Sequence, residues 1–231
     1  MFIFKKVSDE FSIHRYCNLD SDENLFKRKR NCMSIVTLVS GGLDSTFMAV
    51  LIKEEGVKQY PLFVDYGQLC RDAEWRACLA VHRKLDLPEP KLMDIRGFGK
   101  LISSGLTNPK VRLNEDAFLP GRNLLFLLVG ASYAYQTNSN AIAIGLLNEK
   151  DHLFPDQTKN FIKKAESVLN VAMERRIEVL TPLIQFSKKD VMILSRVRHI
   201  KKTYSCHAGV NPPCGKCVSC LEVKNIPKEE V

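Results

Sequence analysis

The chain has 231 residues, of which 45% are hydrophobic, so it can bury one substantial core without a second full domain. No apolar run is long enough to span a bilayer, and the first residues lack the apolar centre of a secretory signal, so we expect a cytoplasmic protein with no membrane partner. The formal net charge of +8 is compatible with RNA, but a nucleotide substrate accounts for it equally well.

Residues 1–32 mix aromatic, acidic and basic side chains without periodicity and end near a basic cluster at residues 27–30. We interpret this segment as a tail outside the core, and Met33 as an alternative start of the protein. Such a cluster can contact nucleic acid, although a solvated tail is the better interpretation.

The core is organised around residues 33–55. An apolar run at residues 35–39 predicts a buried strand, which leads into the loop Ser-Gly-Gly-Leu-Asp-Ser-Thr at residues 40–46 and then into a helical pattern. Two adjacent glycines let backbone N–H groups converge, and three hydroxyl side chains add donors at the positive end of the helix. The loop therefore predicts a phosphate site, with a purely structural turn as the alternative.

The loop is not a Walker A motif, because it lacks the terminal Gly-Lys-Ser/Thr and carries the carboxylate of Asp44 instead. A carboxylate next to a phosphate requires Mg²⁺ or a lysine between the two negative charges. The loop resembles the pyrophosphate-binding loop of the PP-loop ATPases, which cleave ATP between its α and β phosphates.

A second strand at residues 57–64 ends in Asp65-Tyr66-Gly67-Gln68. Ligand-binding residues in open α/β sheets gather at the carboxyl ends of strands, so we expect this tetrapeptide to lie at the site. Tyr66 could equally be a packed aromatic residue. A helix at 71–86, a third strand at 91–95 and a long loop at 96–118 follow.

A strongly apolar helix is predicted at residues 124–135, followed by a strand at 141–146. Arg122 precedes this helix, where a cation opposes the helix dipole, so we expect it to face an anion rather than lie on the surface. The next helix runs to about residue 171 and is preceded by Phe154-Pro155-Asp156. Asp156 suits the N-cap of that helix, and a ligand role is the alternative.

A fifth strand at residues 177–180 leads to a helix at 188–199. Ser187 and Asp190 have the spacing of a capping box. Lysines at a helix N-terminus are unfavourable, so we expect Lys188 to reach a phosphate and to supply the positive charge that Asp44 requires.

Four cysteines, Cys206, Cys214, Cys217 and Cys220, lie within fifteen residues. This spacing suits one tetrahedral zinc ion better than disulfides, with an iron–sulfur cluster as the alternative. Because the protein would supply all four ligands, we expect a structural zinc that holds down the C-terminal segment without taking part in the chemistry. The other four cysteines show no grouping, and we interpret them as ordinary thiols: Cys17, Cys32, Cys70 and Cys78.

The chain resembles the 7-cyano-7-deazaguanine synthase family through six motifs that follow one another from about residue 33 to 222. They are V-S-G-G-L-D-S, F-V-D-Y-G-Q, L-P-G-R-N-L-L-F, F-P-D, T-P-L-I-x2-S-K-x-D and S-C-x7-C-G-K-C-x2-C. The resemblance implies a Rossmann-like, doubly wound, mostly parallel sheet in a PP-loop domain at 33–200, with a zinc-binding segment at 201–231. It also implies the conversion of 7-carboxy-7-deazaguanine and ammonia to the nitrile on the pathway to queuosine and archaeosine.

The implied chemistry uses two ATP and Mg²⁺. ATP adenylates the carboxylate, ammonia forms the amide, and a second adenylation of the amide oxygen permits loss of AMP, so no protein nucleophile is required. The resemblance implies catalytic roles for Asp44, Arg122 and Lys188. It implies ATP binding by Leu38, Val39, Ser40, Gly41, Gly42, Leu43, Asp44, Ser45, Thr46, Asp65 and Tyr66. It implies substrate binding by Gln68, Arg122, Asn123, Phe154 and Asp156, with Asp156 pairing with the guanine-like N–H edge.

The chain departs from the family at two places. It has Gln157-Thr158 where many relatives have Cys-Arg, and Glu222 where relatives often have an arginine. These departures keep open a PP-loop enzyme that modifies tRNA or amidates another carboxylate, and a zinc-ribbon nucleic-acid binder is a more distant alternative. We expect a small-molecule substrate and ammonia as partners, with no obligatory nucleic acid; the sequence leaves a homodimer open.

Overall fold

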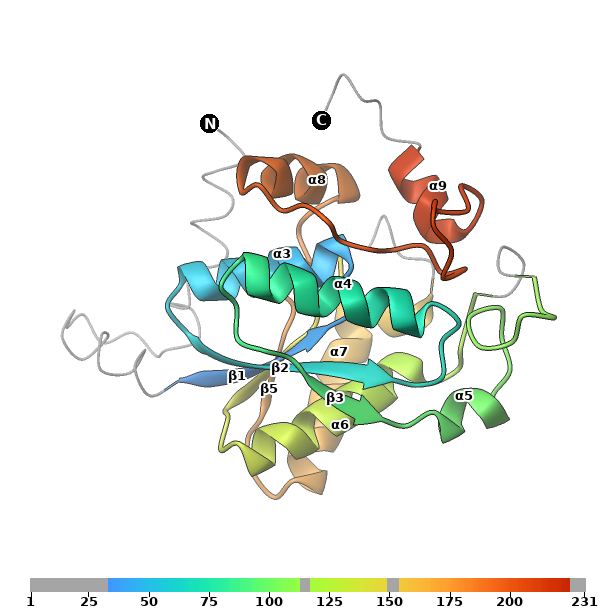
Figure 1. Ribbon diagram of the computed structural model, residues 1–231. Helices are drawn as coiled ribbons and strands as arrows, with labels where there is room; N and C mark the ends of the chain where they lie inside the picture. The colour runs from blue at the N-terminus through green and yellow to red at the C-terminus, as the bar shows by residue number, and fades with distance from the viewer. Residues whose placement is uncertain (1–32, 113–116, 149–153, 225–231) are drawn as a thin grey trace.

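The computed structural model describes residues 33–112, 117–148 and 154–224, so the predictions for residues 1–32 lie outside the described residues. Five strands form one sheet in the order β3-β2-β1-β4-β5, and every pairing is parallel (Figure 1). The strands are β1 (Ser34–Val39), β2 (Lys58–Asp65), β3 (Lys91–Asp94), β4 (Ala141–Ala143) and β5 (Glu178–Leu180).

Helices cover both faces of the sheet, with α3, α4 and α8 on one side and α6 and α7 on the other (Figure 1). The helices are α3 (Leu43–Glu54), α4 (Arg71–Lys84), α5 (Gly97–Leu101), α6 (Arg122–Gln136), α7 (Lys159–Ala172), α8 (Lys188–Val197) and α9 (Val218–Lys224), with a 3₁₀ turn at Pro155–Gln157. This three-layer arrangement confirms the predicted doubly wound α/β fold.

The central strand β1 is apolar except at Ser34 and Thr37, and its position in the sheet explains this composition. All six of its residues are buried, and successive side chains point to opposite faces. Ile35 packs with Phe47 of α3, whereas Val36 packs with Leu127 of α6 and Leu169 of α7. A strand that is covered on both faces needs apolar residues at every position rather than at alternate ones.

The strand order places the loop after β1 at the point where the chain reverses direction across the sheet. β1 pairs with β2 on one side and with β4 on the other. The chain connections on the two sides of β1 run over opposite faces of the sheet, and this opens a crevice at the carboxyl ends of the two central strands. The predicted phosphate loop lies at this crevice.

Two predictions about helix boundaries were wrong. The segment at 96–118 contains the short helix α5, although its glycines suggested a loop throughout. Gly99 is required there because its N–H donates to the Tyr66 carbonyl at 2.9 Å and a Cβ would collide with that same oxygen. Asp156 does not cap α7, because the hydroxyl of Thr158 accepts the hydrogen bond from Phe161 N at 3.1 Å.

Helices α3 and α8 are joined by an ion pair at each end. Lys188 Nζ lies 2.7 Å from Asp44 Oδ2 at the start of both helices, and Arg198 Nε lies 2.8 Å from Glu54 Oε1 at their ends. The predicted capping box of α8 is present, since Asp190 N donates to the Ser187 hydroxyl and Ser187 N donates to the Asp190 carboxylate. In the described part of the chain, no helix combines the length and the apolarity needed to cross a bilayer.

We expect Gly41→Ala to destabilise the fold more than Gly56→Ala does. Both glycines have positive φ angles, 76° and 71°, so alanine costs about 1–3 kcal/mol of backbone strain at either position. A Cβ at residue 41 would in addition lie 2.5 Å from the Glu74 carbonyl and 2.7 Å from Cys78 N, whereas nothing lies within 4 Å of one at residue 56. Urea unfolding followed by circular dichroism measures the loss in free energy of unfolding for each variant. An equal loss for the two variants would contradict this account of the loop.

Candidate functional site

A cavity of about 300 Å³ lies at the carboxyl ends of the central strands. Its walls come from the loop after β1, the end of β2, the start of α6, the start of α8 and the C-terminal cysteine segment. Thirteen of the predicted site residues line it: Leu38, Val39, Ser40, Gly42, Leu43, Asp44, Ser45, Tyr66, Gln68, Arg122, Asn123, Phe154 and Lys188. The fold thus brings together side chains that are separated by up to about 150 positions in the sequence.

The loop is held in shape by its own hydroxyl groups. Ser40 N donates to Ser45 Oγ at 3.1 Å, and the two serine hydroxyls lie 3.0 Å apart. Gly42 is the N-cap of α3, and no side-chain hydrogen bond caps the helix there. The N–H groups of the first turn of α3 are therefore left for an anion, which is the arrangement that a phosphate site requires.

The Asp44 carboxylate and the Lys188 ammonium group form a close ion pair inside the cavity. Lys188 Nζ donates to both carboxylate oxygens, at 2.9 and 2.7 Å, and its side chain is only 11% exposed. Glu222 Oε2 lies 3.9 Å from the same nitrogen. A positive charge thus stands beside Asp44, at the position where the sequence required a countercharge.

An aromatic wall faces this charged group. The rings of Tyr66 and Phe126 lie 5.3 Å apart, and the guanidinium group of Arg122 lies 5.9 Å from the Phe126 ring centre. Burial raises the pKa of Tyr66, so its hydroxyl stays protonated. Arg122 Nε is buried without a hydrogen-bond partner in the described structure. The wall suits a planar heterocycle, and Arg122 can still donate to an acceptor there.

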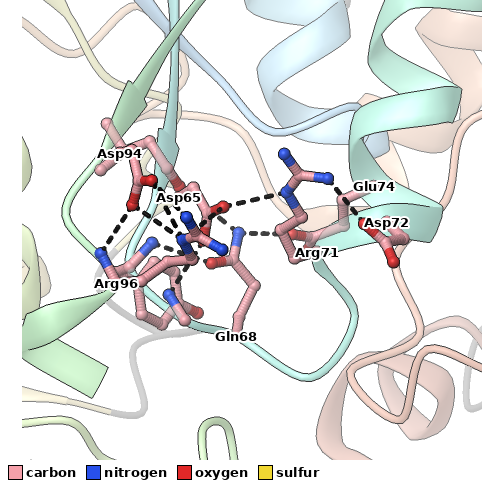
Figure 2. Close-up of polar contacts among 10 residues, drawn as sticks. Asp65, Gln68, Arg71, Asp72, Glu74, Asp94 and Arg96 are labelled. Carbon is pink, nitrogen blue, oxygen red and sulfur yellow. Dashed lines mark hydrogen bonds and ion pairs between the residues drawn. The ribbon is translucent and has the colours of Figure 1, made fainter. Parts of the chain in front are cut away.

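Three predicted ATP residues do not line the cavity. Thr46 is buried in the core, and Gly41 packs against the backbone of α4. Asp65 faces a second cleft, where its carboxylate accepts hydrogen bonds from Gly67 N at 3.1 Å and Arg71 Nε at 2.9 Å (Figure 2). All three therefore support the loop and its neighbours from outside the cavity, and any contact with ATP stays a prediction.

Asp156 also lies outside the cavity lining. Its Oδ2 accepts from Asn123 N at 3.4 Å, and its main-chain carbonyl accepts from Asn123 Nδ2 at 3.0 Å, so it supports the first turn of α6. The other carboxylate oxygen, Oδ1, is buried without a hydrogen-bond partner in the described structure. That oxygen is the part of Asp156 that can still accept a hydrogen bond from a ligand.

The four predicted cysteine ligands come together. Their sulfur atoms all lie within 4.8 Å of one another, so the cluster could hold a metal ion. Backbone N–H groups point at the sulfurs: Cys214 N donates to Cys206 Sγ and Cys217 N donates to Cys214 Sγ, both at 3.3 Å. Backbone hydrogen bonds of this kind lower the pKa of Cys214 to about 6, which favours the thiolate that binds metal.

The C-terminal segment also lines the cavity, which no motif in the sequence indicated. Tyr204 N donates to the Gly41 carbonyl at 2.9 Å, and Ser205 and His207 lie in the cavity wall. Burial lowers the pKa of His207 to about 4, so the ring is neutral, and its Nδ1 is buried without a partner in the described structure. The segment therefore forms part of the cavity wall, while the expectation that its zinc ion takes no part in the chemistry stays a prediction.

A second residue that sequence reasoning missed is Glu74 of α4. Its side chain lines the cavity and accepts a hydrogen bond from Gln68 Nε2 at 3.1 Å. It lies in an ordinary amphipathic helix without a motif of its own. Cys70 and Cys78, by contrast, are buried, do not line the cavity and lie outside the metal-binding cluster, while Cys17 and Cys32 lie outside the described residues.

Comparisons with known proteins agree with this geometry. Curated proteins named 7-cyano-7-deazaguanine synthase match most of the chain: the protein from Prochlorococcus marinus strain MIT 9312 is 33% identical over 81% of this chain and 90% of its own length. The protein of that name from Nitratiruptor sp. is 31% identical over 85% of this chain and 94% of its own length.

Two solved structures share the fold at TM-scores of 0.50. One is described as a predicted subunit of tRNA methyltransferase from Methanocaldococcus jannaschii, at 18% identity over 71% of this chain and 74% of that chain. The other is a U34-tRNA thiolase from Methanococcus maripaludis with its 4Fe-4S cluster, at 14% identity over 96% of this chain and 71% of that one. The family model described as queuosine biosynthesis protein QueC matches residues 34–226, and the chain therefore belongs to the QueC family.

Proposed function

We propose that this protein synthesises 7-cyano-7-deazaguanine from 7-carboxy-7-deazaguanine and ammonia with ATP, as the names of its relatives indicate. The observation that carries the proposal is the Asp44–Lys188 ion pair, which lies in one cavity with the uncapped start of α3 and the aromatic wall. An enzyme of this kind needs an anion site next to a slot for a planar base, and both are present.

The ATP phosphates would bind at the start of α3. The N–H groups of the first turn of α3 and the hydroxyls of Ser40 and Ser45 would receive the pyrophosphate that leaves. Lys188 would neutralise part of its charge. Mg²⁺ prefers carboxylate and phosphate oxygens, so Asp44 fits as its protein ligand, and the bound ion would supply further neutralisation of the phosphates.

The substrate carboxylate is a poor electrophile, so its oxygen must first become a leaving group. Adenylation of that oxygen allows ammonia to form an amide, and adenylation of the amide oxygen then permits loss of AMP to give the nitrile without any redox change. Arg122, whose Nε has no partner within the described residues, would donate to the carboxylate or to a phosphate. Catalysis would then come from positioning and charge stabilisation, without a protein nucleophile.

We propose that the cysteine cluster holds one structural zinc ion, since four thiolates at this spacing fill a tetrahedral site and leave no open position. The ion would fix the segment that carries Tyr204, Ser205 and His207 into the cavity wall. Elemental analysis separates zinc from an iron–sulfur cluster, which would show iron and visible absorbance.

An alternative function is tRNA modification by the same ATP chemistry. That reading favours a catalytic cysteine pair at the site, yet neither Cys70 nor Cys78 lines the cavity. We therefore propose a free small-molecule substrate and no obligatory nucleic acid. Incubating the protein with ATP, ammonium and 7-carboxy-7-deazaguanine, followed by mass spectrometry of the products, tests the proposal directly.

We expect Asp44→Asn to lower pyrophosphate release from ATP by about 100-fold or more, because it removes the charge that organises Lys188 and the cation site. Glu54→Gln is the matched control, since it weakens the ion pair at the other end of the same two helices. It should change stability slightly and leave pyrophosphate release unaffected. Wild-type rates in Asp44→Asn would contradict the assignment.

We expect Asp156→Asn to weaken binding of 7-carboxy-7-deazaguanine by about 1–3 kcal/mol, because an amide N–H would then face substrate N–H groups. ATP affinity should barely change. Isothermal titration of each ligand measures both effects. An equal loss for the two ligands would point instead to damage at the start of α6, where the Asp156 carboxylate accepts from Asn123 N.

We expect Cys214→Ser to give sub-stoichiometric zinc and to lower the unfolding temperature by roughly 5 °C or more. Because Tyr204 N binds the Gly41 carbonyl, ATP affinity should fall as well. Lys216→Ala is the control, since residue 216 is exposed and lies between two ligands. Full stability in a zinc-free protein would overturn the structural role of the metal. Unchanged ATP affinity in the folded variant would contradict the expected effect of metal loss on the cavity wall.

A further inference from the structure

The carboxyl group of Glu74 lies at the inner side of the cavity, where the proposed chemistry has not used it. Gln68 Nε2 donates to Glu74 Oε2 at 3.1 Å, and Gln68 is itself fixed because its Oε1 accepts from Tyr66 N at 3.0 Å. Figure 2 shows Gln68 between the Asp65–Asp94–Arg96 group and Glu74. Gln68, itself held by Tyr66 N, thus holds the Glu74 side chain in place.

Burial raises the pKa of Glu74, while hydrogen bonds from Gln68 and from the Cys70 thiol lower it, as does the charge of Arg122. Burial also raises the pKa of Cys70, so the thiol keeps its proton and can donate it to the carboxylate. Glu74 still has some exposed surface and lines the cavity. We conclude that its remaining exposed surface faces the cavity, where a small ligand can reach it.

Among the residues that the structure describes, three carboxylates line the cavity: Asp44, Glu74 and Glu222. The first and the last lie 2.7 and 3.9 Å from Lys188 Nζ. Across the described ranges, no ion pair joins Glu74 to a lysine or an arginine. Arg122 acts on the Glu74 carboxylate through its charge but does not contact it. A largely buried carboxylate with no cation in direct contact favours a small positively charged ligand, because burying such a charge is costly.

We propose that Glu74 binds the incoming ammonium ion and accepts a proton from it. This inference rests on the proposed function, which requires ammonia to reach the adenylated carboxylate in this same cavity. Gln68 and the Cys70 thiol already donate to the carboxylate, and ammonium, with its four N–H donors, is small enough to reach it from the cavity that Glu74 lines.

The proton transfer gives a balanced step. Ammonium passes one proton to the Glu74 carboxylate and becomes ammonia. The nitrogen lone pair forms the C–N bond to the acyl carbon of the adenylated substrate, and the C–O bond to AMP breaks with both electrons leaving on the AMP phosphate. The second proton lost by nitrogen passes to that phosphate, so the products are the amide, protonated AMP and neutral Glu74.

Two measurements on the full-length protein test this role. Exchange of pyrophosphate into ATP, supported by 7-carboxy-7-deazaguanine without ammonium, reports adenylation. Nitrile formation against ammonium chloride concentration gives the KM for ammonium. We expect Glu74→Gln to keep exchange near the wild-type rate and to raise the KM for ammonium about ten- to hundredfold, because a charge-assisted contact is lost.

Glu74→Asp keeps the carboxylate and should give a KM for ammonium between those of the wild type and Glu74→Gln. If Glu74→Gln does not fold, the KM of Glu74→Asp provides the test, and an unchanged value would overturn the inference. Asp72→Asn is the matched control on the same helix, because its side chain is 73% exposed and pairs with Arg71. An unchanged KM for ammonium in Glu74→Gln, or an equal loss of exchange and synthesis, would overturn the inference alone. A wild-type protein that makes no nitrile would overturn the proposed function.

Discussion

The structure depends on a single ion pair that connects two helix starts. Asp44 and Lys188 are 144 positions apart in the sequence, and their side chains meet at the positive ends of α3 and α8. A lysine at a helix N-terminus is unfavourable by itself, and a carboxylate in a phosphate loop is unfavourable for the phosphate. Each group offsets the cost of the other, so both can be kept beside an anion site.

The pair is stabilised by the packing behind it. Phe47 and Met48 of α3 are buried against Val191 and Leu194 of α8, in the same cluster as the residues of β1. The outer pair of Glu54 and Arg198 is more exposed and contributes less, because solvent screens it. The hydrophobic contact therefore fixes the spacing of the helices. At that spacing the Asp44 and Lys188 side chains are close enough to form their ion pair in the cavity.

The segment at residues 204–222 forms part of the cavity wall instead of a separate appendage. It reaches the loop through Tyr204 and the Gly41 carbonyl, and it brings Glu222 close to Lys188. The cysteine cluster, the geometry of the loop and the charge around Lys188 are thus connected through a few short contacts.

The sequence by itself determined the fold class, the loop after β1 and the grouping of the four cysteines, because these depend on local pattern: apolar runs, adjacent glycines and cysteine spacing. The meeting of Lys188 with Asp44 also followed from local reasoning, since each residue was unfavourable where it stood. Only the tertiary structure decided that Asp156 supports α6 rather than capping α7, that Asp65 faces a second cleft, and that Glu74 and His207 line the cavity. These placements depend on which helix face and which chain end pack against the crevice, and no local pattern in a single sequence records such long-range packing.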